Sequence, residues 1–186
     1  MPLARSALSL EHALLGFLRE RPMHAYEIHQ RLLRAEALGL VWRLKQAQLY
    51  ALLARLEEAG YLAGSLEPQG NRPPRKVLRL TPEGRAALED WLSEPVEHGR
   101  DFRLEFLAKL YFAGEGGPRS TAELIERQRK TCRDSLRALE SRLSALQPRR
   151  PYDQLVYEFR IGQLRAILAW LDTCEATLAV SDPPSS

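Results

Sequence analysis

Residues 46–61, QAQLYALLARLEEAGY, carry the clearest helical pattern of the 186-residue chain. Leu49, Leu52, Leu53 and Leu56 recur at the i, i+3, i+4, i+7 spacing that places apolar side chains on one buried stripe. The residues that helical projection puts on or beside the opposite face are mostly small or uncharged: Ala47, Gln48, Tyr50, Ala51, Ala54 and Arg55. A solvated helix normally carries Lys and Glu there, so the pattern predicts a smooth face that a partner can approach closely.

Two shorter helices are expected before this segment. Ser9 is a suitable N-cap for the first, which Pro22 ends, and the second runs from about His24 to Glu36, with Gly39 as a breaker after it. The apolar residues expected on their buried sides are Leu10, Leu14, Phe17 and Leu18 in the first and Tyr26, Ile28, Leu32 and Leu33 in the second. The third helix ends at Gly60, in the position where a left-handed C-cap is favoured.

The apolar pattern then changes to a period of two. Residues 61–66, YLAGSL, and 75–80, RKVLRL, are strand-like and are joined by the turn-rich EPQGNRPP, so a hairpin with a long tip is expected. Thr81 caps a fourth helix with Pro82 at its first position, and this helix ends before Pro95. Three short helices followed by a two-stranded hairpin is the order of a winged helix-turn-helix domain, whose third helix enters the major groove of DNA.

The distribution of charge favours an anionic partner, although the formal net charge is only +3 and the pI is near 9.0. Residues 37–56 and 68–82 contain basic side chains and no carboxylate, which favours phosphate contacts and avoids repulsion. The alanines would let the third helix sit deep in a groove about 12 Å wide. The residues predicted to bind DNA are Arg43, Lys45, Gln46, Gln48, Tyr50, Arg55, Asn71, Arg72, Arg75 and Lys76.

Several of these residues have a plainer structural alternative. Gln46 and Gln48 either read adenine through paired hydrogen bonds or are ordinary residues of an early helical turn. Tyr50 lies at the edge of the leucine stripe, so it either contacts a phosphate or packs on the edge of the core. Arg72, at the hairpin tip, contacts the minor groove or the DNA backbone unless it is a free surface arginine.

Residues 96–180 are predicted to form a helical dimerisation domain. A short helix at 100–114 is followed by two long helices, separated by prolines near residue 150. The last helix has two apolar stripes, one of Ile161, Leu164, Leu168, Leu171 and Leu178 and one of Leu155, Phe159, Gly162, Ala166 and Ala169. A helix that is apolar on two sides must be covered on two sides. A two-fold homodimer is therefore expected, with recognition helices about 34 Å apart to match half-sites one DNA turn apart.

Together these segments resemble the PadR-like transcriptional regulators of bacteria and archaea. The resemblance rests on HAYEIHQRL at 24–32, QLYALLARLEEAGYL at 48–62 and NRPPRKVLRLTPEGRAALEDWL at 71–92, and the C-terminal half is similar to the helical region of longer members. It implies a homodimeric repressor, often acting near its own gene and released from DNA by a small molecule or another signal. It also implies a phosphate contact for Tyr50 and backbone contacts for the wing.

Other residues bear on ligands and chemistry. Trp42, Trp91 and Phe106 are candidates for lining an effector pocket, although aromatics at helical spacing usually belong to the core. The sequence has no P-loop, nucleophile-elbow or dinucleotide-binding glycine motif and its four histidines lack metal-ligand spacing, so we expect no enzyme, cofactor or metal. Cys132 and Cys174 are expected to be reduced, buried thiols. The sequence has no apolar run of ~18 residues, so the protein is expected in the cytoplasm and not in a membrane.

The expected architecture is mostly α with a small β-hairpin wing: a winged helix-turn-helix DNA-binding domain at 1–95, a helical dimerisation domain at 96–180 and a disordered tail at 181–186. The expected function is sequence-specific regulation of transcription on double-stranded operator DNA. The alternative is a winged-helix protein-interaction module whose alanine-rich face docks another chain. Salt separates the two, because counterion release makes DNA binding fall steeply with ionic strength.

Overall fold

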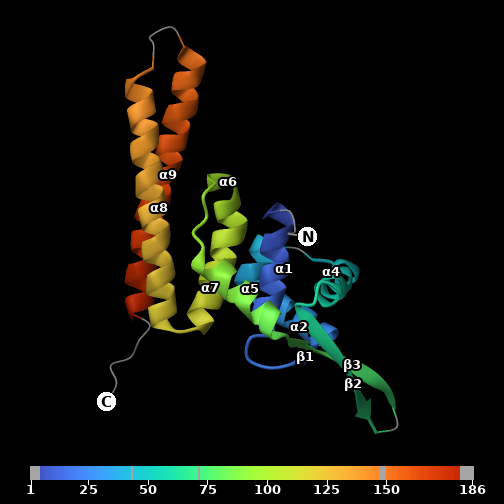
Figure 1. Cartoon of the computed structure of the whole chain (residues 1–186). Coiled ribbons are helices and arrows are strands. Elements are labelled where there is room, and N and C mark those ends of the chain that lie inside the picture. The colour runs from blue at the N-terminus through green and yellow to red at the C-terminus, as the bar shows by residue number, and fades with distance from the viewer. Residues whose placement is uncertain (1–4, 43, 71, 147–149, 181–186) are drawn as a thin grey trace. The chain divides into compact units, whose positions relative to one another are not determined.

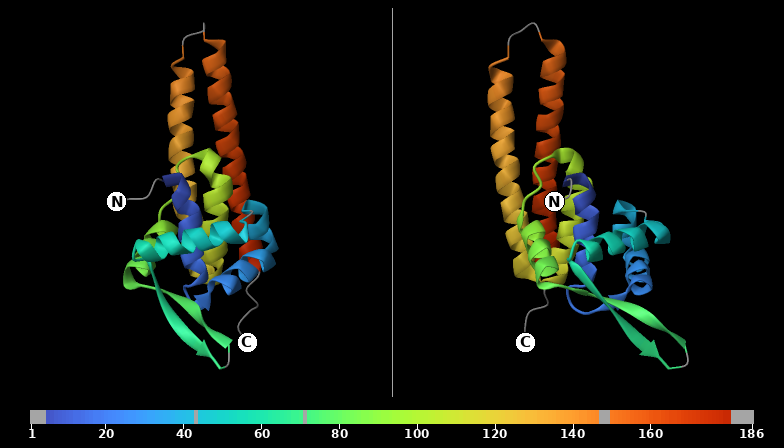
Figure 2. Two further views of the ribbon diagram at one scale, coloured as in Figure 1. Left: turned by 90° about the vertical axis from the view of Figure 1, so that its right-hand side faces the viewer. Right: turned by 45° about the vertical axis from the view of Figure 1, so that its right-hand side comes forward.

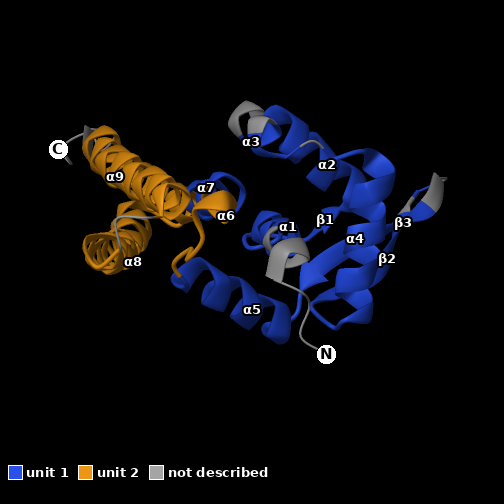
Figure 3. Ribbon diagram, turned by 90° about the horizontal axis from the view of Figure 1, so that it is seen from above, with its two compact units in different colours: residues 1–94, 103–112 blue, residues 95–102, 113–186 orange. Residues whose placement is uncertain are grey.

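The computed structural model describes residues 5–42, 44–70, 72–146 and 150–180 (Figure 1). The tail predicted at 181–186 lies outside the described residues. Among the described residues, two compact units are distinguished: unit 1 holds those up to Glu94 together with Arg103–Phe112, and unit 2 holds Pro95–Phe102 and those from Ala113 onward (Figure 3). The domain boundary predicted near residue 95 stays a prediction, and in the structure residues 103–112 belong to the N-terminal unit.

The N-terminal helices of unit 1 differ in detail from the predicted ones. They are α1 (Arg5–Phe17), α2 (Ala25–Arg34), α3 (Glu36–Val41) and α4 (Gln46–Glu58). Ser9 is not the N-cap of α1, because the helix begins four residues before it. Gly39 is not a breaker: it lies inside α3, since a single Gly costs a helix only about 1 kcal/mol relative to Ala and a packed neighbour such as Leu38 can offset that cost.

The wing is the hairpin of β2 (Leu62–Gln69) and β3 (Arg72–Leu80), and both strands are longer than expected. A third strand that the sequence did not reveal, β1 (Met23–His24), pairs with β3 through Met23↔Leu78 and His24↔Val77. The sheet is antiparallel with the order β1-β3-β2. Figure 2 shows the two long strands extending beyond the helices of unit 1. Their register shifts between Glu67 and Gln69, at Pro68, which cannot donate a ladder hydrogen bond.

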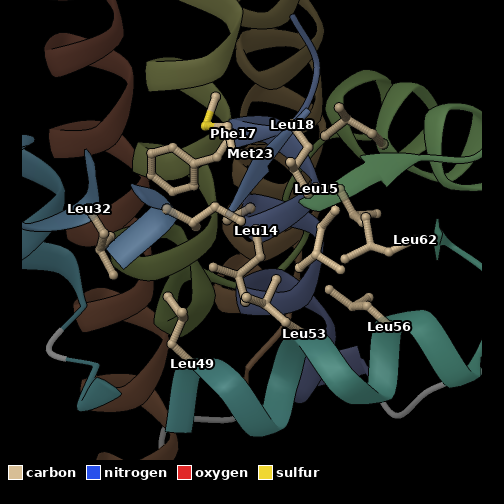
Figure 4. Packing of buried hydrophobic residues seen from close by; sticks show 14 of the residues in the cluster. Leu14, Leu15, Phe17, Leu18, Met23, Leu32, Leu49, Leu53, Leu56 and Leu62 are labelled. Atoms are coloured by element: carbon tan, nitrogen blue, oxygen red, sulfur yellow. The ribbon is translucent and has the colours of Figure 1, made fainter. Parts of the chain in front are cut away.

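The leucine stripe of α4 packs into the core of unit 1, as predicted. Leu49, Leu53 and Leu56 are buried, and Figure 4 shows them pointing toward Leu14, Leu62 and their neighbours. Full burial of a leucine side chain contributes about 1.5–3 kcal/mol, so three of them fix which face of α4 is left outside.

Gly60 closes α4 in the left-handed conformation that was predicted. Its φ is +81°, and the amides of Gly60 and Tyr61 donate to the carbonyls of Glu57 and Leu56 at 3.0 and 2.9 Å. This pair of hydrogen bonds is a Schellman motif, which satisfies carbonyls at the helix end that would otherwise have no partner.

The last elements of unit 1 are α5 (Pro82–Ser93) and α7 (Leu107–Glu115), up to Phe112. Thr81 caps α5 as predicted, since its Oγ1 accepts from the Gly84 amide at 3.0 Å. Between them lie the single turn α6 (Gly99–Asp101) and a π-helical turn, η1 (Phe102–Phe106).

Lys109 ties α7 to α5 although its side chain is only 1% exposed. Its Nζ donates to the carbonyl of Glu94 at 2.7 Å, pairs with Glu105 at 2.8 Å and lies 5.3 Å from the centre of the Trp91 ring. Burial lowers the pKa of this lysine, and the pairing with Glu105 opposes the shift. A buried cation is tolerated here because hydrogen bonds and a carboxylate replace its water.

Unit 2 is built mainly from α8 (Pro118–Ser144) and α9 (Pro151–Val180), which lie side by side in every view. Arg129 joins them, with bonds to Asp172 at 3.1 Å and to Glu175 at 2.5 Å. Gln128 is fully buried, and its amide accepts from the Val96 N–H at 2.7 Å and donates to the Val96 carbonyl at 2.9 Å. These bonds hold the chain at residue 96 against α8.

The two predicted stripes of α9 behave differently. Ile161 and Leu171 of the first stripe are buried, whereas all five residues of the second stripe are exposed, with Phe159 at 71% and Leu155 at 63%.

Cys132 and Cys174 are free, buried thiols whose pKa values burial raises, as expected of reduced structural cysteines. In the part of the chain that the structure describes, no helix combines the length and the apolarity needed to cross a membrane.

Candidate nucleic-acid interface

The outward face of α4 is smooth and exposed, as the sequence predicted. Its exposed residues are Ala47, Gln48, Tyr50, Ala51, Ala54 and Arg55. Methyl groups in the middle of this face leave the backbone of α4 accessible to a partner that fits closely. Gln48 also has a structural role, because its Oε1 accepts from the Lys45 backbone N–H at 3.2 Å and so caps the start of the helix.

A hollow of about 990 Å³ lies beside this face, bounded by α4, the wing and the start of α2. We call it the wing groove. Residues that line it include Tyr26, Tyr50, Ala54, Glu57, Arg75 and Lys76. Tyr26 and Tyr50 keep 60% and 43% of their surface exposed, so a ligand in the groove can reach both side chains. The groove therefore brings the recognition helix and the cations of the wing to one surface.

Carboxylates also line the wing groove, and two of them are paired with cations. Lys76 Nζ donates to Glu57 Oε2 at 2.5 Å, and Arg21 pairs with Glu27. The hydrogen bond from Arg21 is the largest cause of a lowered pKa at Glu27. Lys76, in a segment that is free of carboxylates along the chain, is thus partly neutralised in space by Glu57.

Arg55 is engaged in the same way, with a more deeply buried partner. Its Nη2 donates to Glu11 Oε1, and Glu11 on α1 is only 1% exposed. The guanidinium side chain itself is 55% exposed. Arg55 is therefore first the counter-ion of a buried carboxylate, and a phosphate contact would have to share it.

The remaining predicted residues are placed as follows. Lys45 and Gln46 are exposed at the start of α4, and Arg75 is exposed on β3. Arg43 and Asn71 lie outside the described residues, and so does the side chain of Arg72, whose backbone belongs to β3.

Two of the three aromatic residues considered for an effector pocket are core residues. Trp91 belongs to the apolar core of unit 1 and stacks on His12 with ring centres 5.7 Å apart, and Phe106 is fully buried. Trp42 packs against the same core and is half-buried. Direct ligand contact is thus least hindered at Trp42.

Sequence reasoning missed Tyr26 and Glu57 as residues of this surface. Tyr26 was expected to be buried with Leu33, yet both are exposed. Helical projection could have shown it, because Tyr26 lies about 160° around the helix from the buried Ile28. Glu57 carries no such signal, since its partner Lys76 is 19 residues away.

The three-stranded sheet, the α4 helix and the hairpin beside it define a winged helix-turn-helix domain, joined to a helical C-terminal unit. The profile of the transcriptional regulator PadR-like family matches residues 14–90, and that of the virulence activator alpha C-terminal family matches residues 102–179. The negative transcriptional regulator PadR of Bacillus subtilis is 29% identical over 138 residues, 74% of this chain and 71% of that protein. The winged helix-turn-helix domain is thus that of the PadR-like family of transcriptional regulators.

A further relative and two solved structures are also similar to this chain. The probable transcriptional regulator Rv1176c of Mycobacterium tuberculosis is 27% identical over 181 residues, covering 89% of this chain and 95% of that protein. A crystal structure of Bacillus subtilis PadR in complex with operator DNA is similar over 91% of this chain and 98% of that one, with 25% identity and a TM-score of 0.45. The same protein in complex with p-coumaric acid matches 92% of this chain and 99% of that one, with 24% identity and a TM-score of 0.41. The relatives are named as regulators of transcription and not as enzymes.

Proposed function

We propose that this protein is a sequence-specific repressor that binds double-stranded operator DNA through α4 and the wing. The observation that supports it best is the smooth, exposed face of α4 beside a groove that carries the wing cations Arg75 and Lys76. A face of this kind fits the major groove, and the wing then reaches the phosphate backbone. A regulator of transcription works where its DNA is, so we place the protein in the cytoplasm.

The recognition residues have distinct proposed roles. Gln46, exposed in the first turn of α4, can use both ends of its amide to read adenine. The Oε1 of Gln48 already caps the helix, so Gln48 reads a base through its amide N–H groups or gives up the cap. Tyr50, Lys45 and Arg75 would contact phosphates, which position the protein without reading sequence.

We also propose that Arg43, Asn71 and Arg72 contact DNA, on the strength of the sequence pattern. Replacing Arg72 by Ala should weaken binding to every duplex and flatten the slope of log K against log salt by up to about one unit. An unchanged slope would remove Arg72 from the interface. Replacing Gln46 by Ala should instead change the preference among sequences.

The second apolar stripe of α9 supports a homodimer. Phe159, Leu155 and Tyr152, at 71%, 63% and 76% exposure, form a face too apolar to remain in water. A second copy related by a two-fold axis would cover it with the same face. Sedimentation at micromolar concentration should give a dimer for the natural sequence and a monomer for Phe159→Glu; a natural monomer would refute the proposal.

Release by a small molecule is proposed by similarity, because a relative has been crystallised with p-coumaric acid. Trp42 is the aromatic candidate that an effector could reach without repacking, whereas Trp91 and Phe106 are proposed to respond indirectly through the core. A change in Trp42 fluorescence on adding an effector would test this, with Trp42→Phe as the control.

Fluorescence anisotropy tests the DNA-binding function itself. A labelled duplex from upstream of the protein's own gene and a scrambled duplex would be titrated at about 50 and 200 mM salt. Tighter binding to the natural duplex, weakened by salt, is expected of a specific DNA-binding regulator. Failure to bind either duplex at low salt would favour the protein-interaction module.

A further inference from the structure

The last turn of α4 places a carboxylate among the wing cations and bonds it to one of them. Glu57 Oε2 accepts from Lys76 Nζ at 2.5 Å, which joins the recognition helix to β3. The two side chains remain 29% and 53% exposed, so this ion pair faces the wing groove and not the core. Lys76 is therefore held by a protein carboxylate on the surface where a phosphate would also attract it.

Gly64 on β2 makes the room that this ion pair needs. A Cβ placed on Gly64 would lie 2.6 Å from Glu57 Oε1 and closer still to Lys76 Cε. Gly64 is not among the described glycines with positive φ. A methyl group at this position would therefore displace the ends of both side chains of the ion pair, which lies directly over Gly64.

The backbone of Lys76 is fixed as well. His24 Nδ1 lies 3.1 Å from the Lys76 carbonyl oxygen, within hydrogen-bonding distance, beside the point where β1 pairs with β3. Lys76 is thus held at its main chain from one side and at its ammonium group from the other. Glu57 accordingly determines where the ammonium group of Lys76 lies relative to α4.

We propose that Glu57 is a specificity-determining residue, which acts by positioning Lys76 and by opposing phosphates that approach the groove. This inference rests on the proposed DNA-binding function. Affinity for unrelated DNA comes almost entirely from cations that neutralise phosphates. A carboxylate that pairs with one of these cations therefore lowers the affinity for unrelated DNA, with nothing to offset the loss. The complex with the operator also depends on where the Lys76 ammonium group lies, so it gains from the same ion pair. Specificity is the difference between these two affinities.

The test compares Glu57→Gln, Gly64→Ala and Glu58→Gln with the natural sequence in the full-length protein. Glu58 is the neighbouring, exposed carboxylate of α4 and does not line the wing groove, so Glu58→Gln makes the same change of charge without touching the ion pair. Gly64→Ala displaces the two side chains of the ion pair from their present positions and leaves the net charge unchanged. Affinities would be measured by anisotropy on a duplex selected from a random pool with the natural protein and on its scrambled counterpart, with thermal melts to confirm folding.

Glu57→Gln should tighten binding to the scrambled duplex by about three- to tenfold at low salt and steepen its salt slope by up to about one unit. The ratio of operator to scrambled affinity should fall in both Glu57→Gln and Gly64→Ala and stay unchanged in Glu58→Gln. Equal ratios in all four proteins would overturn the inference, and so would an equal fall in Glu58→Gln, which would indicate bulk charge alone. If the natural protein enriches no duplex, the proposed function itself fails.

Discussion

The ion pair between Arg55 and Glu11 predicts that a residue expected to bind DNA is needed for folding. In Arg55→Ala, the Glu11 carboxylate, which is 1% exposed in the natural protein, loses its partner, while Glu11 Oε2 already has no hydrogen-bond partner among the described residues. Removing one member of a fully buried ion pair costs about 3–5 kcal/mol. Because the Arg55 side chain is 55% exposed, water can reach part of the vacated space, and we expect a loss of about 2–3 kcal/mol.

Urea unfolding at neutral pH measures this loss. Trp170→Phe would serve as the parent, since it leaves Trp42 and Trp91 as fluorescence probes and both belong to unit 1. In that parent, Arg55→Ala combined with Glu11→Gln should recover at least about 1 kcal/mol, because an uncharged amide is less costly to bury than an unpaired carboxylate. Arg79→Ala, at an exposed arginine of the same unit, should change stability by less than about 0.5 kcal/mol. The reasoning is refuted if Arg55→Ala matches the parent or if Glu11→Gln rescues nothing.

Three further predictions concern other contacts. Thr81→Ala should lower the free energy of unfolding by about 1 kcal/mol in urea titrations, whereas Thr81→Ser, which keeps the capping oxygen, should stay close to the parent. Gln128→Leu, in the natural sequence, should cost about 2 kcal/mol because it leaves both polar groups of Val96 buried without a partner; urea unfolding followed by circular dichroism, which detects the helices of unit 2, measures this, and an unchanged midpoint would contradict it. The pKa of Lys109 is lower in the folded protein than the ordinary value of 10.5. At a pH between these two pKa values, Lys109 is mostly protonated in the unfolded chain and mostly deprotonated in the folded protein. The stability of the natural protein relative to Lys109→Met should therefore rise as the pH increases toward 10.5, and a fall would contradict the direction of the shift.

Periodic and capped elements could be predicted from the sequence. The leucine stripe of α4, the cap at Thr81 and the left-handed Gly60 all depend on residues within a few positions of one another, and the structure confirms each of them. The strand β1 could not be recognised, because two residues, Met23 and His24, are too few to show a period of two.

The surface chemistry was only partly predictable, for a different reason. The exposed face of α4 follows from its pattern, but the partners of its charges do not. Glu11 lies 44 residues before Arg55, and Glu57 lies 19 residues before Lys76. Only the tertiary fold brings these groups together, so counting carboxylates along the chain overstated the positive charge that is available to DNA.

The return of the chain to unit 1 after residue 102 bears on how the protein can be dissected genetically. Ala108 and Phe112 of α7 belong to the core of unit 1; Phe112 packs edge-on against Phe17 with ring centres 5.2 Å apart and covers Gly16. A fragment ending at Glu94 would leave a cavity the size of an aromatic ring, which destabilises a small domain by about 3–5 kcal/mol. A chimaera joined at residue 95 would have an open core, whereas a junction in the loop after Glu115 keeps that core closed and loses the hydrogen bonds between Gln128 and Val96.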